Sequence, residues 1–530
     1  MKTIKAGMHA ILSIQNSNSH CSALGDRFVH DALHITQPKD AGCMSGTREL
    51  VLAKFMAWIE NDPTSIFWLA GMAGTGKTSI ALTLCRMLND DPSVVLGGTF
   101  FCSRSAGSIS RTEPRRILPT LAASLAAQIS DYATMLAAQL KVDDTIVHKP
   151  VDDQIVPLLV KPFTQLASIT HPIVFVVDAL DECSDERELS ELITAIADFR
   201  SNAKVKFILT SRPEMHIRGT PISNPNHNAI LHLHTISEEE VEADICRYIV
   251  GTLQIAAPYA SWYSGRNIEA LTRLSGGLFI FASTALKYIL DPDNDEDRQQ
   301  RLGKATSFST NRTAAKTTMD NMYELVLTEA CRDDKVDDDE LEGIQRILAC
   351  ILSARAPLSV EALADLIGST PLKLRGSLRR LHSLVYLPPS DVEPGLRTLH
   401  ASFGDYILST RAASHIRIAT TLGDLALTRG CLCVMASRLH FNMSQIQSSH
   451  EPNPSTRPNC ITLSLEYACL QWIYHVSAMP DASKFDKEIE TAFLPRFLFW
   501  IEVIGILRRV SRAAAMLLFA TSTVSGTHYY

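Results

Sequence analysis

Short runs of apolar residues alternate with longer segments of helical periodicity through the first half of the chain. The apolar runs are Ile66–Ala70, Leu96–Cys102, Ile173–Val177, Val205–Thr210 and Ile230–His234. Continuous apolar runs of this length are typical of strands that are buried on both faces. Because strands that alternate with helices form parallel sheets, we predict an α/β fold in which helices sandwich a parallel sheet.

Downstream of residue 235 the strand pattern gives way to helical periodicity. One helix is expected to begin at Ser237 and another to run through Ile268–Leu290, whereas the polar stretch Asp291–Lys316 is expected to be a linker. Further on, two short helices precede the apolar segments Leu384–Leu387 and Leu396–Leu399, which are separated by a turn containing prolines. This order predicts a winged helix, and the remainder is predicted to be mostly helical.

Composition and charge exclude several classes of protein. The chain has 530 residues, of which 46% are hydrophobic and 20% charged, so several globular domains are expected rather than disorder. The net charge is -7 and no basic stripe is visible in the sequence, which argues against nucleic acid as the default partner. No apolar run reaches the ~20 residues of a membrane span. The twelve scattered cysteines fit a reducing compartment, and we expect a cytoplasmic protein.

The segment directly after the first predicted strand fits the pattern G-x-x-x-x-G-K-[ST]. It reads Gly71-Met-Ala-Gly74-Thr75-Gly76-Lys77-Thr78 and precedes a predicted helix. Glycines allow backbone N–H groups to approach phosphate oxygens, and a helix N-terminus favours the same anion. Lys77 adds positive charge near the β- and γ-phosphates, and the Thr78 hydroxyl is placed to ligate Mg²⁺. The motif predicts a P-loop that binds ATP or GTP; a glycine-rich turn without function is the alternative.

Acidic residues follow the third predicted strand. Ile173–Val177 runs into Asp178, and Asp181 and Glu182 come shortly after. Because the carboxyl ends of strands in such sheets face the ligand, Asp178 is expected to hold Mg²⁺. Glu182, or else Asp181, is a candidate general base that polarises the attacking water. A solvated acidic loop is the alternative.

Arg212 follows the next predicted strand at the same edge of the sheet. It is a candidate to contact the γ-phosphate, and a surface arginine before a proline turn is the alternative. About a hundred residues separate Lys77 from Asp178, and Leu96–Cys102 adds a strand within that span. This spacing favours the P-loop class with an extra strand between the two motif strands, which generally hydrolyses nucleotides.

Together these motifs resemble those of NACHT-domain proteins, which belong to the STAND class of signal-transduction ATPases with numerous domains. The resemblance is to the fungal NOD-like-receptor group and to the nephrocystin-3-like N-terminal NTPase module. The matching segments are Gly46–Arg48, Phe67–Thr78, Phe100–Arg104, Asp178–Cys183, Leu209–Pro213, Gly277–Ile280 and Leu399–Tyr406. The sequence departs from plant and animal relatives at Phe279, where they have a proline that touches the base. An N-terminal effector and C-terminal sensor repeats are also not recognised.

The resemblance implies domains that close over ADP. Thr47 and Arg48 are then expected to contact the nucleotide, and His400 to hydrogen-bond the β-phosphate of ADP; a capping or core role is the alternative for His400. The expected segments are an N-terminal extension (1–45), a NACHT P-loop NTPase core (46–235), a helical domain with a linker (236–316), a winged helix (317–412) and a helical C-terminal region (413–530).

The function implied by this combination is a molecular switch that binds ATP, ADP or GTP with Mg²⁺ and hydrolyses the triphosphate slowly. The switch is expected to be closed with ADP and to self-associate with ATP, in intracellular signalling or a fungal non-self response with an unknown partner protein. Two alternatives remain open: a plain P-loop hydrolase or kinase, and a scaffold that binds nucleotide only for stability.

Overall fold

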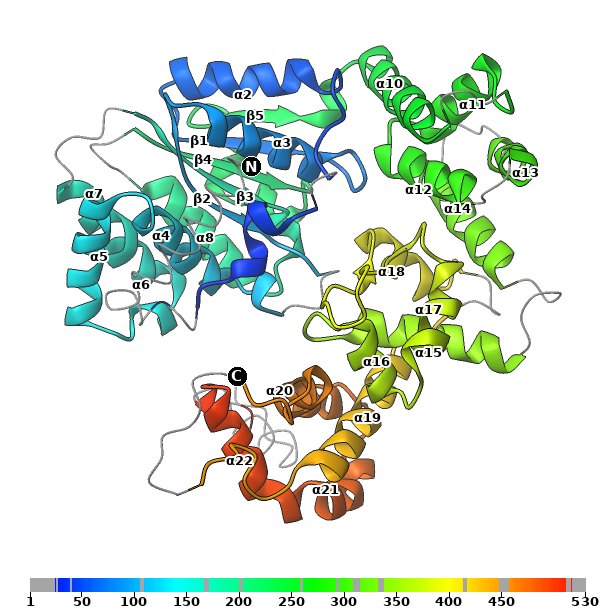
Figure 1. Ribbon diagram of the computed structural model, residues 1–530. Helices are drawn as coiled ribbons and strands as arrows, with labels where there is room; N and C mark the ends of the chain where they lie inside the picture. The colour runs from blue at the N-terminus through cyan, green and yellow to red at the C-terminus, as the bar shows by residue number, and fades with distance from the viewer. Residues whose placement is uncertain are drawn as a thin grey trace. The chain divides into compact units, whose positions relative to one another are not determined.

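The computed structural model describes most of the chain in two compact units, residues up to 315 and residues from 316 onward (Figure 1). The described residues are 27–38, 41–104, 109–165, 171–199, 204–257, 261–291, 295–307, 315–331, 338–412, 417–447 and 457–510, together with Leu24 and Met516. The predicted N-terminal extension therefore lies largely outside them. Within these ranges, no helix is long and apolar enough to cross a membrane.

A five-stranded parallel sheet forms the centre of the first unit, which confirms the predicted fold class. The strands are β1 (Ile66–Ala70), β2 (Val95–Phe101), β3 (Ile173–Asp178), β4 (Val205–Ser211) and β5 (Ala229–His232), in the order β2-β3-β4-β1-β5. The two motif strands β1 and β3 are separated by an extra strand, as the spacing suggested. That strand is β4, whereas β2 lies at the sheet edge.

Helices cover both faces of the sheet because alternate side chains of each strand point to opposite sides. Phe67 and Leu69 of β1 share one core with α2 (Glu49–Asn61) and α3 (Lys77–Asp90). Ile66 and Trp68 belong to the other core. The helices on that second side are α4 (Ile117–Ala126), α5 (Ser130–Val142), α6 (Val151–Ile155), α7 (Lys161–Gln165) and α8 (Glu186–Asp198), with a π-helical turn at Val156–Val160.

The first unit continues into four helices, and here two predictions were wrong. The helices are α10 (Glu238–Ala256), α11 (Gly265–Ser275), α12 (Phe279–Leu290) and α13 (Asp295–Thr306). The helix predicted over Ile268–Leu290 is two helices, because Gly276 (φ 51°) and Gly277 (φ 79°) adopt the left-handed backbone that ends a helix. The predicted linker Asp291–Lys316 contains α13, whose acidic first turn is favourable against the helix dipole. Residues 292–294 and 308–314 lie outside the described residues.

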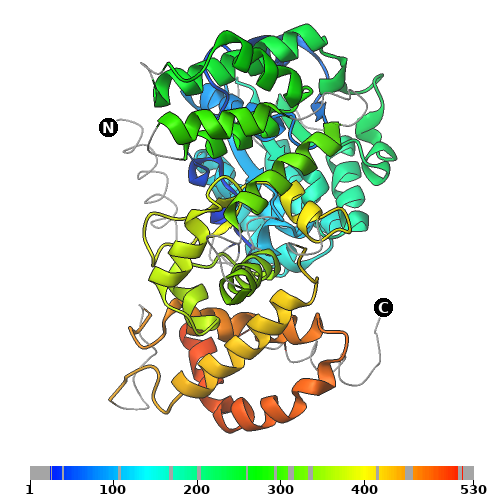
Figure 2. The same cartoon turned by 90° about the vertical axis from the view of Figure 1, so that its right-hand side faces the viewer.

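Among its described residues, the second unit is mostly helical and contains one short hairpin. Its elements are α14 (Ala315–Ala330), α15 (Asp338–Ser353), α16 (Val360–Leu366), α17 (Pro371–Arg379), β6 (Val385–Tyr386), β7 (Arg397–Thr398), α18 (Ala401–Ile407), α19 (Leu422–Arg438), α20 (Leu463–Ser477), α21 (Asp486–Ala492) and α22 (Phe497–Ile506). Strands β6 and β7 are antiparallel and lie within the two segments predicted to form a wing. Figure 2 shows the helices from α19 onward packed on one another.

A buried lysine joins the end of α2 to strand β4. The Nζ atom of Lys206 donates to the carbonyl oxygens of Trp58 (3.1 Å), Asp62 (2.7 Å) and Thr64 (3.1 Å). The same ammonium lies 4.1 Å from the centre of the Trp58 ring. Lys206 therefore satisfies carbonyl groups at the C-terminal end of α2, and holds the helix whose other end reaches the phosphate loop.

We predict that Lys206→Met lowers the free energy of unfolding by about 1–3 kcal/mol, because buried carbonyl oxygens lose their donor. Chemical denaturation followed by tryptophan fluorescence measures the change. Lys204→Met is the matched control, since Lys204 is exposed at the residue before the same strand. Equal denaturation midpoints for the two variants would contradict the role given to Lys206.

Candidate nucleotide-binding site

The phosphate loop lies between β1 and α3, in the strand–loop–helix context that the motif predicted. Gly74 and Gly76 have φ of 78° and 93°, a backbone conformation that favours glycine. A Cβ atom on Gly74 would lie 2.2 Å from a methyl group of Ile280, at the start of α12. The Ile280 N–H also donates to the Gly74 carbonyl (3.2 Å). The loop is therefore packed tightly against the helical part of the same unit.

Lys77 directs its amine into the phosphate loop. Its Nζ atom donates to the carbonyl oxygens of Gly71 (2.7 Å) and Met72 (3.0 Å). Burial lowers the pKa of Lys77, and the nearby carboxylates of Asp181 and Asp178 oppose that effect. The Lys77 ammonium is thus bound only by neutral carbonyl groups of the loop in these contacts. A phosphate group would form a stronger, charge-assisted hydrogen bond with it.

Thr78 and Asp178 lie in direct contact. The Thr78 hydroxyl donates to Oδ2 of Asp178 (2.7 Å), and the Thr210 hydroxyl of β4 donates to Oδ1 (2.5 Å). Asp178 is 1% exposed, and burial raises its pKa while the two hydroxyl groups lower it. A hydroxyl and a carboxylate side by side supply oxygen ligands of the type that Mg²⁺ takes. The residues present therefore fit the metal that the motif implies.

Two acids follow Asp178 in a turn, Leu180–Glu182, which begins after Ala179 in the left-handed region (φ 58°). Asp181 is paired with Arg212: the backbone N–H of Arg212 donates to Oδ1 (2.9 Å) and its Nε lies 3.0 Å from Oδ2. Glu182 instead accepts a hydrogen bond at Oε2 from the backbone N–H of Arg104 (2.8 Å). Burial raises the pKa of Glu182 to about 7.

Arg48 contacts the phosphate loop at Thr75. Its Nη2 donates to the Thr75 carbonyl (3.0 Å), its backbone N–H donates to Oδ2 of Asp244 (3.0 Å), and its guanidinium lies 4.9 Å from the centre of the Phe279 ring. Arg48 is only 3% exposed, and its Nε and Nη1 atoms are buried without a hydrogen-bond partner. Buried donors without a partner are costly in a folded protein, so Arg48 stays a candidate to contact the nucleotide.

The remaining two predicted residues have local roles. The Thr47 hydroxyl donates to the carbonyl of Met44 (2.7 Å), just before α2. His400, in the second unit, is the N-cap of α18, where its Nδ1 atom accepts from the backbone N–H of Ser402 (3.1 Å). This is the capping role that the sequence left open for His400. Its contact with a β-phosphate stays a prediction.

Sequence reasoning gave no role to two residues that contribute to this site, Arg104 and Asp244. Arg104 ends the segment Phe100–Arg104 after β2, which pairs with β3. A basic residue at the end of a strand beside the Asp178 strand was a usable signal, had the strand order been known. Asp244 lies in the middle of α10 and carried no such signal.

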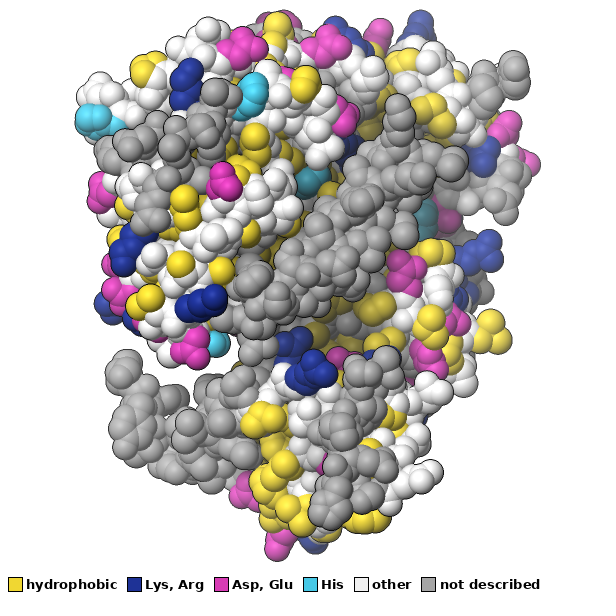
Figure 3. Space-filling model, turned by 60° about the vertical axis from the view of Figure 1, so that its left-hand side comes forward, with side chains coloured by type: hydrophobic (Ala, Val, Ile, Leu, Met, Phe, Trp, Pro, Cys, Tyr) yellow, Lys and Arg dark blue, Asp and Glu magenta, His cyan; other side chains and the backbone are white. Residues whose placement is uncertain are grey.

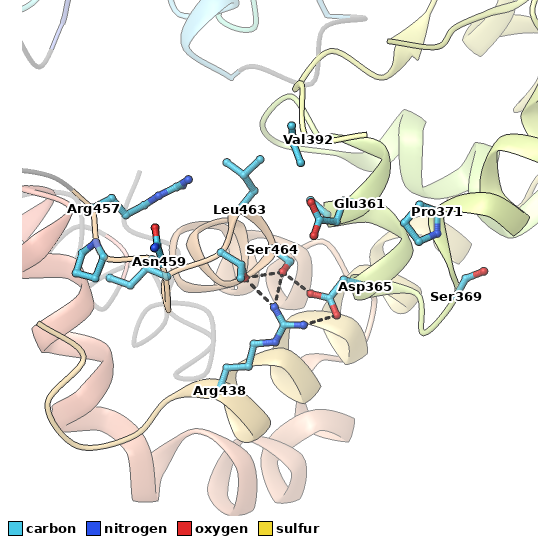
Figure 4. A pocket seen from close by; sticks show the side chains of 14 residues that line it. Glu361, Asp365, Ser369, Pro371, Val392, Arg438, Arg457, Asn459, Leu463 and Ser464 are labelled. Carbon is cyan, nitrogen blue, oxygen red and sulfur yellow. Dashed lines mark hydrogen bonds and ion pairs between the residues drawn. The ribbon is translucent and has the colours of Figure 1, made fainter. Parts of the chain in front are cut away.

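A separate hollow of about 440 Å³ lies in the second unit, between α16, α19 and α20 (Figure 4). Arg438 donates to Asp365 (2.7 Å), Thr462 (2.8 Å) and Ser464 (3.1 Å), and Ser464 also contacts Asp365. Because these polar side chains satisfy one another, the hollow is best understood as a hydrogen-bonded junction between helices.

Residues 46–212 match the family model described as Nephrocystin 3, N-terminal. This match confirms the resemblance of that segment to the nephrocystin-3-like N-terminal NTPase module. No curated protein matched the sequence.

Solved structures similar to the chain are distant. One is a STAND protein with a tetratricopeptide repeat sensor from Pyrococcus horikoshii, at 12% identity and a TM-score of 0.39, covering 89% of this chain and 64% of that one. The chain thus spans less than two thirds of its length. Cdc6p from Pyrobaculum aerophilum has 11% identity and a TM-score of 0.33, covering 67% and 91%. Orc1 from Aeropyrum pernix, solved with DNA, has 14% identity and a TM-score of 0.34, covering 74% and 94%. TM-scores this low carry no argument about function.

We predict that Lys77→Ala weakens the binding of ATP at least about tenfold, on the order of 1.4 kcal/mol, because the phosphates lose a charge-assisted hydrogen bond. Calorimetry with the full chain measures the affinity. Lys54→Ala removes an exposed lysine of α2 and serves as the control. An unchanged affinity in a folded Lys77→Ala protein would falsify the assignment of the phosphate loop.

Proposed function

We propose that the chain is a nucleotide-binding molecular switch that takes ATP or ADP, or the guanine equivalents, with Mg²⁺. The observation that carries this proposal is the convergence at one sheet edge of the buried Lys77 amine, the Thr78–Asp178 contact and the orphaned donors of Arg48. All belong to the first unit and surround the same loop. A bound nucleotide requires positive charge near its phosphates, oxygen ligands for its metal and hydrogen-bond donors for its other polar groups, and these residues supply all three.

Each of these residues has a separate task in the proposed site. The backbone N–H groups of the loop and the first turn of α3 bind phosphate oxygens, and Lys77 neutralises their charge. Thr78 and Asp178 hold the metal, which when bound with nucleotide neutralises further negative charge on the phosphates. Arg48 contacts the loop at Thr75 and is proposed to donate its Nε and Nη1 groups to the nucleotide, away from the transferable phosphate. The Phe279 ring beside Arg48 offers an apolar surface next to these groups.

Hydrolysis by this site is proposed to be slow, with Glu182 as the general base. Asp181 is a weaker candidate because Arg212 occupies both of its carboxylate oxygens. Glu182 has a pKa of about 7, which suits a group that must accept a proton near neutral pH. One oxygen of this carboxylate, Oε2, accepts from the Arg104 N–H, and the other, Oε1, is proposed to accept the proton of the attacking water. Arg212 is proposed to contact the γ-phosphate from its position beside Asp181.

The wider role proposed for the switch is signalling through a change of assembly. The resemblance to NACHT proteins supports a form that is closed with ADP and self-associates with ATP, with an unknown partner protein and without nucleic acid. The second unit adds a surface suited to protein contact, because Leu494, Leu498 and Ile501 are exposed at helical spacing and Leu498 is 74% exposed. Hydrophobic side chains on the molecular surface are yellow in Figure 3. An intracellular location is part of the same proposal.

We predict that Glu182→Gln preserves the affinity for ATP and slows hydrolysis at least about tenfold, because an amide does not accept the proton of the attacking water. In the wild-type protein the rate should rise as the pH rises through about 7, since the base acts only when its carboxyl group is deprotonated. Single-turnover hydrolysis between pH 6 and pH 8, about one unit on either side of that pKa, measures both effects.

If Glu182→Gln hydrolyses ATP at the wild-type rate, Glu182 is not the base, and Asp181 becomes the candidate. A wild-type protein that binds ATP and never hydrolyses it would instead support the scaffold alternative. Turnover that increases strongly with a small-molecule acceptor would support a metabolic kinase.

We predict that His400→Leu accelerates the release of ADP, because a hydrogen bond from His400 to the β-phosphate would join the two units only in the closed form. One charge-assisted hydrogen bond is worth about 1.5–3 kcal/mol, which corresponds to a ten- to about a hundredfold shift in population. Stopped-flow dissociation of a fluorescent ADP analogue measures the rate, and light scattering measures oligomers.

Ser402→Ala is the matched control for this prediction. It removes the hydroxyl that lies 2.6 Å from His400 Nδ1, and so disturbs the same cap while leaving the imidazole in place. If His400 only caps α18, both variants should have lower melting temperatures, and the ADP dissociation rate should be unchanged in both. That result would remove His400 from the nucleotide site.

A further inference from the structure

The guanidinium of Arg104 binds three consecutive carbonyl groups of the turn that follows β3. Its Nη2 atom donates to the carbonyl oxygens of Asp181 (2.8 Å) and Cys183 (3.0 Å), and its Nε donates to that of Glu182 (3.2 Å). A planar guanidinium with several fixed N–H groups suits such a set of acceptors, whereas a lysine ammonium does not match it. The side chain of Arg104 therefore holds the backbone of this turn.

The backbone of Arg104 holds the carboxylate carried by the same turn. Its N–H donates to Oε2 of Glu182 (2.8 Å), so that one residue binds both the main chain and the side chain of Glu182. The neighbouring acid is held differently, because Asp181 is paired with Arg212. The Glu182 carboxylate is thus bound from the end of β2, whereas the carboxylate of its neighbour Asp181 is bound from the end of β4.

The turn itself does not determine where this carboxylate lies. Ala179 has a left-handed backbone, and the turn contains only two short-range hydrogen bonds, from Glu182 N–H to the Ala179 carbonyl (2.9 Å) and from Cys183 N–H to the Leu180 carbonyl (3.1 Å). Arg104 supplies donors to the carbonyl groups of residues 181–183, so its loss would weaken the hold on the part of the turn that carries Glu182.

We propose that Arg104 is a positioning residue for hydrolysis, which holds the turn after β3 so that the carboxylate of Glu182 faces the attacking water. This inference rests on the proposed function, since it concerns the rate of hydrolysis. The hydrogen bonds of Arg104 described above join it to residues 181–183, and not to the phosphate loop, Thr78 or Asp178. Its loss should therefore slow turnover and leave nucleotide affinity unaffected, which separates it from the residues that bind nucleotide.

The experiment is a mutant cycle in the full chain that combines Arg104→Ala with Glu182→Gln. Single-turnover ATP hydrolysis, ATP affinity by calorimetry and melting temperature are measured for both single variants and the double variant. Arg104→Ala should slow hydrolysis about tenfold or more while the affinity stays within about threefold. The double variant should be no slower than Glu182→Gln alone, because Arg104 acts through Glu182 and the two losses are not additive.

Two further variants serve as controls. Arg187→Ala removes an arginine of α8 whose side chain is 89% exposed and forms only a surface ion pair with Glu191, and it should hydrolyse at the wild-type rate. Arg104→Lys keeps the positive charge without the fork of donors, and it should recover only part of the lost rate. If Arg104→Ala does not fold, Arg104→Lys takes its place. It should then hydrolyse ATP more slowly than the wild-type protein while its ATP affinity stays within about threefold.

The outcomes separate this inference from the proposed function. A wild-type rate in Arg104→Ala, or an additive loss in the double variant, would overturn the positioning role while the proposed function stands. Equal losses of rate, affinity and melting temperature would show that Arg104 only supports the fold, which also overturns it. A wild-type protein without any ATP hydrolysis would overturn the hydrolytic part of the proposed function, and the role of Arg104 with it.

Discussion

The carboxylate of Asp178 is buried where three elements of the first unit meet. Its two oxygens accept hydrogen bonds from Thr78 in the first turn of α3 and from Thr210 of β4, while its backbone ends β3. Removing a carboxylate from water is costly unless its oxygens are paired. Any displacement of α3 or β4 at this edge would leave a buried charge without a partner. The phosphate loop, which leads directly into α3, therefore depends on Asp178 for its position against the sheet.

Around this carboxylate, further charged residues are held by groups from other segments of the chain. Arg212 pairs with Asp181, Arg104 binds the carbonyl groups of residues 181–183, and the Arg48 backbone binds Asp244. Arg48 and Ala179 both have left-handed backbones, which cost about 1–3 kcal/mol each and persist only where the surroundings hold them. The Ala179 N–H is held by the Thr210 hydroxyl (2.9 Å). Strain and charge are thus concentrated at the edge proposed to bind nucleotide.

Much of this organisation was predictable from local pattern. The five strands begin and end close to the predicted apolar runs because both faces of the sheet are covered, which leaves no polar alternation along a strand. Local pattern failed where a few residues override a longer trend. Gly276 and Gly277 interrupt an apolar helical stretch, and α13 forms from charged residues that resembled a linker, because its acidic first turn favours helix formation.

The sequence by itself determined the strands, the phosphate loop and the acids that follow β3, because each depends on neighbours within a few residues. Only the tertiary structure decided that β4 lies between β1 and β3, because strand pairing brings together segments more than a hundred residues apart in the chain. It also decided which acid remains available: Asp181 and Glu182 are adjacent and chemically alike, yet Arg212 occupies one and Arg104 orients the other. Those partners come from β4 and β2, whose ends meet the turn only after the sheet has formed.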